Sequence, residues 1–140
     1  MSVKKLFNPK WWLVGFAVLH TVMFLVPQLF ATSSVLEMAW GEGAAPEHAG
    51  FYEFRLGALG IAYTPMLFAM AYLTTGTTRA KMAVITALAM GVVVVLDVAT
   101  SINQAGYLED MSMAFLLGLP VSVFGGLLAS GLLHLKEDGE

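Results

Sequence analysis

The sequence predicts an all-α integral membrane protein, a single domain over residues 1–140 folded as a four-helix up-down bundle. Hydrophobic residues make up 58% of the chain and charged residues 12%, about half the charged share of a typical soluble domain. Four apolar runs are each close to the length of about 20 residues that crosses a bilayer core. Outside these runs, basic residues are confined to alternate segments, the distribution that orients membrane helices.

The first predicted span covers residues 11–30. Trp11 and Trp12 open it, and paired tryptophans suit a membrane–water interface. A cleavable signal peptide is the competing interpretation, because the segment Ala31-Thr32-Ser33 resembles a cleavage site. The length of the apolar run favours a retained membrane helix.

An acidic loop is predicted over residues 31–50. Within it, Ser33 or Ser34 is expected to cap a short helix through Trp40, since Glu37 stands where a capping box needs an acid. Several glycines and a proline follow and are expected to end this helix.

The remaining spans are predicted over residues 51–73, 82–102 and 111–133. Pro65 lies near the centre of the second span, where a proline usually produces a kink. Residues 74–81 are expected to form a polar connection between the second and third spans. Four antiparallel helices with short connections make an up-down bundle.

Basic residues predict the orientation of the bundle. Outside the spans they are Lys4, Lys5, Lys10, Arg79, Lys81 and Lys136. They fall in the N-terminal segment, the second connection and the C-terminal tail, whereas the first and third connections have none. The positive-inside rule therefore places both termini in the cytoplasm, or the equivalent side of an organelle membrane, for a bacterial inner-membrane or organelle protein.

Small residues recur every four positions along the fourth span, at Gly118, Ser122, Gly126 and Ser130. Such a stripe lets helix backbones approach closely inside a membrane, where the hydrophobic effect does not drive helices together. It fits internal bundle packing, and the alternative is the seam of a homodimer.

Two charges inside the spans suggest an ion pair. Arg55 lies near the start of the second span and Asp97 near the end of the third, so antiparallel helices place them at similar depth. A charge within a membrane is costly, and pairing reduces the cost. An Arg55–Asp97 contact in the outer half of the bundle is the leading expectation.

A second arrangement places Glu53 inside instead. Glu53 and Arg55 are separated by about 200° around a helix, so they cannot both face the interior. Glu53 shares a small, partly polar stripe with Gly57, Gly60 and Thr64. If this stripe faces inward, Glu53 approaches Asp97 and Arg55 extends to the lipid headgroups. Two inward acids would suggest handling of protons or cations.

Asp97 shares one helix face with Thr86, Met90, Ser101 and Gln104. This polar track either lines a water-filled vestibule or satisfies the carboxylate by hydrogen bonds. Of these residues, Ser101 and Gln104 join Asp97, Glu53 and Arg55 as candidates for ligand binding.

His20 lies near the middle of the first span and has three possible roles. It is a candidate proton relay, a candidate axial ligand for haem or a chlorin, or a residue that hydrogen-bonds to a neighbouring helix. No second histidine lies at matching depth for a bis-histidine site. The sequence names no cofactor.

No catalytic motif is present. There is no zinc-ligand spacing, no nucleophile elbow and no phosphate-binding loop, and the chain has no cysteine. The absence of a basic stripe argues against nucleic acid as a partner. These observations favour a protein without its own chemistry.

The layout resembles the DoxX-like group of small four-span membrane proteins. The second helix opens with charge followed by glycines, in the segment Glu53-Phe54-Arg55-Leu56-Gly57-Ala58-Leu59-Gly60, and the similar layout runs from about Trp11 to Leu133. Some members of that group are small subunits beside quinone-linked oxidoreductases. The resemblance implies no catalytic residue in this chain.

Two functions remain open from the sequence. The first is an accessory or assembly subunit without chemistry, in contact with other membrane subunits or with a pigment or quinone. The second is binding or transport of a small molecule, lipid or ion through an outer-leaflet pocket around Arg55 and Asp97. A cavity reaching Asp97 from outside would favour the second, and a filled interior the first.

Overall fold

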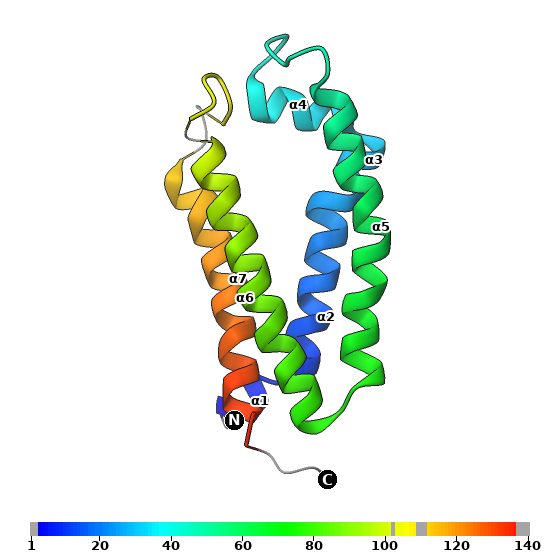
Figure 1. The fold of residues 1–140 in the computed structure, drawn as a ribbon, viewed down its shortest axis with the longest axis vertical. Helices are drawn as coiled ribbons and strands as arrows, with labels where there is room; N and C mark the ends of the chain where they lie inside the picture. Colours follow the sequence, from blue (N-terminus) through cyan, green and yellow to red (C-terminus); the bar gives the residue numbers. More distant parts are fainter. Residues whose placement is uncertain (1–2, 102, 109–111, 137–140) are drawn as a thin grey trace.

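The computed structural model describes residues 3–101, 103–108 and 112–136, and within them every regular element is helical (Figure 1). Four segments of this part of the chain are long and apolar enough to cross a membrane: Val3–Phe30, Ala49–Leu73, Gly76–Ser101 and Leu116–His134. The predicted all-α class is confirmed. Large apolar side chains also remain exposed, including Leu59 at 66% and Val95 at 67%, which suits helices that face lipid.

The first span consists of four consecutive pieces: α1 (Val3–Leu6), α2 (Pro9–His20), the π-helical segment η1 (Thr21–Leu25) and α3 (Val26–Phe30). Asn8 caps α2, because its side-chain oxygen accepts a hydrogen bond of 2.9 Å from the Lys10 backbone amide. The π segment ends two residues before Pro27, which has no backbone N–H to donate. Figure 1 shows α3 turned away from the axis of α2 and lying against α5.

The short helix after the first span is α4 (Thr32–Trp40). The expected serine cap at Ser33 or Ser34 is wrong, since both residues lie inside the helix and no side chain caps it. The Thr32 hydroxyl instead donates to the Gln28 carbonyl oxygen at 2.7 Å, which links α4 to the preceding turn. Gly41, with φ of +85°, ends α4 in a conformation that favours glycine.

The other long helices are α5 (Ala49–Leu73), α6 (Gly76–Ser101) and α7 (Met113–His134). The predicted start of the third span at residue 82 is six residues late, because the charges of Arg79 and Lys81 interrupt the apolar run but not the helix. The Arg79 guanidinium donates to the Thr74 carbonyl oxygen, so it is accommodated at the helix start. Residue 102, the predicted end of the third span, and residue 111, the predicted start of the fourth, lie outside the described residues.

The helices pack as two pairs. α6 runs along α7, whereas the first span runs along α5. Figure 1 shows the two pairs close together at the end that carries both termini and apart at the end that carries α4; these are called the termini end and the α4 end below. The main apolar core includes Leu13, Phe16, Leu67 and Leu127.

Glycines bring the first span against α5. A Cβ atom on Gly57 would stand 2.9 Å from the Gln28 Cβ, and one on Gly60 would stand 3.2 Å from the His20 Cε1. Thr64 completes this buried stripe. The face that carries Glu53 is therefore the one turned toward the first span.

The small-residue stripe of α7 is buried over only half its length. Near the termini end, Gly126 packs against the Trp12 ring and Ser130 is fully buried. Toward the α4 end, Ser122 is exposed, and no atom lies within 4 Å of where a Gly118 Cβ would stand. Internal packing thus accounts for one half of the predicted stripe.

Candidate binding cavity

Two cavities lie between the helix pairs. The mouth cavity, at the α4 end, has a volume of about 390 Å³ and a lining that includes Trp40, His48, Tyr52, Ser101 and Gln104. The deep cavity, of about 360 Å³, lies among α2, α5, α6 and α7, and its lining is mostly apolar; it includes Phe16, Leu19, Phe24, Val93, Val94 and Phe124.

Three residues line both cavities: Glu53, Asp97 and Tyr107. They come from α5, from α6 and from the loop that follows α6. Two carboxylates and a phenol therefore stand where the polar mouth meets the apolar interior. A cavity that reaches Asp97 is present, and this is the feature that distinguishes the second function considered from the sequence from the first.

Glu53 is half-buried and is held from the first span. The Gln28 side-chain amide Nε2 donates to the Glu53 carboxylate Oε2 at 3.2 Å. The close approach at Gly57 brings the two helices near enough for this contact. Gln28 lies in α3, beyond the π segment, so the bend of the first span positions the residue that orients Glu53.

The carboxylate of Asp97 accepts no hydrogen bond from any side chain in the described part of the protein. The Ser101 hydroxyl donates instead to the Asp97 main-chain oxygen, at 2.7 Å. Of the predicted polar track, Ser101 and Gln104 line the mouth cavity and Met90 lines the deep cavity. Thr86 is buried and donates to the Met70 sulfur at 3.6 Å, toward α5. The track residues other than Thr86 therefore line the two cavities, and none of the four hydrogen-bonds to the carboxylate.

Arg55 is not part of the site. Its side chain is exposed, and its guanidinium lies over the Phe51 ring at 5.7 Å from the centroid. It lines neither cavity, so the expected Arg55–Asp97 ion pair is wrong. The inward Glu53 of the second arrangement considered from the sequence is found, because the glycine stripe turns Glu53 toward the first span and leaves Arg55 exposed on α5.

Tyr107 closes the mouth against α4. Its ring meets the Trp40 ring edge to face, with centroids 5.0 Å apart, and the backbone amide of Leu108 donates to the Ala39 carbonyl oxygen at 2.6 Å. Burial, followed by the nearby charges of Asp97 and Glu53, raises the pKa of Tyr107 to about 12. Neither Tyr107 nor Trp40 was selected as a site residue from the sequence, because a contact between a loop and a short helix leaves no periodic pattern.

His20 faces the deep cavity and hydrogen-bonds across to α5. Its Nδ1 lies 3.1 Å from the Thr64 hydroxyl oxygen, and its ring stands edge-on to that of Tyr63 at 5.1 Å between centroids. This is one of the three roles considered from the sequence. Among the described residues, no group of three histidine, aspartate or glutamate side chains is placed to hold a metal ion.

The site thus joins a polar entrance, an acidic boundary and an apolar interior. Such an arrangement suits binding of a molecule with a polar and an apolar part more than it suits bond-making chemistry. Comparison of the chain with protein-family models, with curated protein sequences and with solved structures finds no match.

Proposed function

We propose that this protein binds a small amphipathic molecule or lipid, as a multi-pass membrane protein whose termini face the cytoplasm. The observation that carries the proposal is the pair of cavities that share Glu53, Asp97 and Tyr107. Cavities of roughly 300–1,000 Å³ with mostly apolar walls and a few polar groups are typical of small-molecule sites.

The packing of the helices supports the same function. Tight contacts at Gly126 and Gly131 hold the bundle together near the termini end. At the α4 end, side chains leave a cavity that reaches Asp97 instead of a filled core. A protein whose helices served only to pack against one another would gain stability by filling this space.

The distribution of charge supports entry from the outer side. The basic residues other than Arg55 belong to segments at the termini end, whereas the mouth cavity lies beside α4 at the opposite end. With the termini in the cytoplasm, as the positive-inside rule favours, a ligand enters from the periplasmic, luminal or equivalent face.

Native mass spectrometry of the purified protein tests this function. We expect the wild-type protein to retain small-molecule or lipid adducts through detergent removal. Val93→Trp should lose them, because Val93 lines the deep cavity and an indole would occupy its volume. Val95→Trp on the same helix is the matched control, since Val95 lines neither cavity and is exposed.

Adducts that survive equally in both variants would contradict the proposal. Circular dichroism of the two variants establishes that each retains its helices. Equal adduct loss in Val95→Trp would also count against it, because that residue lies away from the cavities.

An accessory or assembly subunit is the second candidate function. The exposed half of the small-residue stripe, with Gly118 and Ser122, favours it, because the open space at Gly118 allows close approach of a helix from another chain. The resemblance to DoxX-like proteins fits this role, with a quinone or another membrane subunit as partner. The same mass spectra show any protein that remains bound to the native chain.

A further inference from the structure

We infer that the cavity ligand is an organic cation, in which a positively charged group is attached to an apolar body. This inference rests on the proposed function and specifies the chemistry of the ligand. Three independent features of the lining support it: its charge, its aromatic rings and its apolar depth.

The carboxylates of Glu53 and Asp97 border both cavities. Among the described residues, no lysine or arginine lines either cavity, and the histidines His20 and His48 are the other titratable side chains besides tyrosine. Arg55, the nearest basic residue in the sequence, points to the outer face of α5 and rests on Phe51. Glu53 is half-buried and Asp97 is exposed, and two like charges that border one cavity repel each other. A bound cation relieves that repulsion, whereas an anion would be repelled.

Aromatic rings gather beside the two carboxylates. Trp40, Tyr52 and Tyr107 line the mouth cavity, and Trp40 and Tyr107 are in direct contact. The faces of such rings attract organic cations through their negative quadrupole, most strongly where water is excluded. Rings and acids together are better suited to an alkylated ammonium or phosphonium than to a hydroxyl group.

The deep cavity offers a place for the apolar body of the ligand. Phe16, Phe24 and Phe124 line it together with aliphatic side chains, and they offer a surface that a hydrated inorganic ion would not use. With the charged group between Glu53 and Asp97, the apolar part extends inward along α6. Gln28, which donates to Glu53, holds that carboxylate at the boundary.

Isothermal titration calorimetry with three probes of related shape tests the inference. Tetraphenylphosphonium carries one positive charge within four phenyl rings, tetraphenylborate has the same shape with a negative charge, and triphenylphosphine oxide is neutral. In a non-ionic detergent, we expect the protein to bind tetraphenylphosphonium and to discriminate against tetraphenylborate by about tenfold or more.

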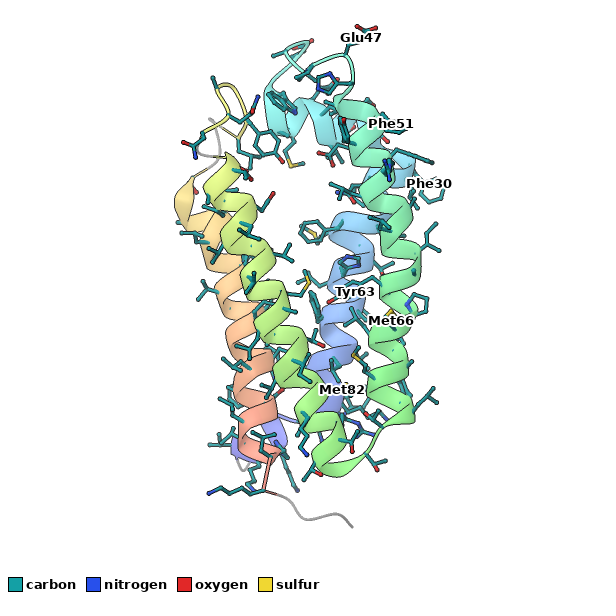
Figure 2. All side chains as sticks on the ribbon, viewed as in Figure 1. Phe30, Glu47, Phe51, Tyr63, Met66 and Met82 are labelled. Carbon is teal, nitrogen blue, oxygen red and sulfur yellow. The ribbon has the colours of Figure 1, made fainter. Side chains whose placement is uncertain are left out.

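The double variant Glu53→Gln with Asp97→Asn should weaken tetraphenylphosphonium binding by about tenfold or more while affecting the neutral probe little. Glu47→Gln is the matched control, since it removes one acidic charge at the same end. Figure 2 shows Glu47 at the tip of the connection between α4 and α5, away from the helix pairs. Its removal should leave binding unchanged.

Three results overturn the inference: no binding of tetraphenylphosphonium, equal binding of the cation and the anion, or unchanged binding in the double variant. The proposed function is decided separately by the adducts of Val93→Trp and Val95→Trp. If those adducts behave as expected while the cation shows no preference, the cavity binds an amphiphile of another charge.

Discussion

Glu53 shows how the close approach of two helices at glycine residues decides the chemistry of the site. Arg55 lies only two residues away on the same helix, yet it faces the opposite direction. Gly57 and Gly60 select the inward face of α5, because only that face lets the first span approach. The acid therefore enters the cavity and the base remains outside.

The outcome for Arg55 shows what could be predicted at single residues. The ion pair between Arg55 and Asp97 was predicted from their similar depth along the helices, and that prediction was wrong. The glycine stripe already indicated that Glu53 faces inward, because small residues mark the buried face of a membrane helix. Gln28 was beyond prediction, since its reach to Glu53 depends on the bend in the first span.

Tyr107 gives a prediction for alkaline pH. Its pKa is about 12 in the folded protein against an ordinary value of 10.0, so between these values the unfolded chain releases a proton that the folded protein keeps. Stability must therefore fall as pH rises through this window. Two pKa units correspond to about 3 kcal/mol, and screening by solvent around the partly exposed phenol makes the effect smaller than this.

Tyr107→Phe should remove the part of the stability loss at alkaline pH that arises from the raised pKa of Tyr107. Thermal unfolding of both proteins in detergent, followed from pH about 9 to about 12, measures the difference. The prediction fails if the two proteins lose stability in parallel throughout that range.

At the scale of elements, α7 approaches α6 most closely at Gly131, among the glycines of α7. A Cβ on Gly131 would stand 2.6 Å from the Val84 Cγ2 and 2.7 Å from the Ala80 carbonyl oxygen. The backbone cannot move as a flexible side chain can, so this contact fixes the separation of the two helices. Gly118 on the same helix has open space around it.

Gly131→Ala should therefore destabilise the protein by about 1–3 kcal/mol, because it forces two helices apart. Gly118→Ala is the control and should be neutral or stabilising by up to about 1 kcal/mol, since alanine is the better helix former. Thermal stability in detergent compares them. Equal effects of the two substitutions would show that the close packing of α6 and α7 does not depend on Gly131.

Elements were predicted well where one strong signal specified them. The apolar runs placed all four spans, because the bilayer thickness sets their length. The π segment was not foreseen, since its sequence is apolar on all sides and carries no local marker apart from Pro27. The start of α6 was misplaced because hydropathy reports membrane burial and a helix continues into the headgroups.

At the scale of the whole molecule, the two termini lie at one end and the mouth cavity at the other (Figure 1). Phe30 and Met66 lie on the outer surface of the first span and α5 (Figure 2), exposed at 81% and 53%. The lateral surface of the bundle thus carries exposed apolar side chains, as suits helices in lipid, while the mouth cavity lies at the α4 end.

Single cysteines test the proposed orientation without interference, because the chain has none of its own. In intact cells or membranes of right-side-out orientation, Glu42→Cys and Ala105→Cys should react with a membrane-impermeant maleimide. Thr78→Cys should react only after permeabilisation. The reverse pattern would place the mouth on the cytoplasmic side and refute the orientation.

The separation of the helix pairs has a mechanical consequence. α5 and α6 are joined at the termini end by the short segment between Leu73 and Gly76, and their packing against each other is sparse. α6 has 26 residues, so it acts as a lever of roughly 39 Å, and a rotation of about 5° at its base moves its tip by about 3 Å. Lateral pressure in one leaflet acts at that tip. The contact between Tyr107 and Trp40 of α4 joins this tip to the other helix pair, so this contact should respond to the lipids around the protein, and the bilayer itself would adjust access to the acids.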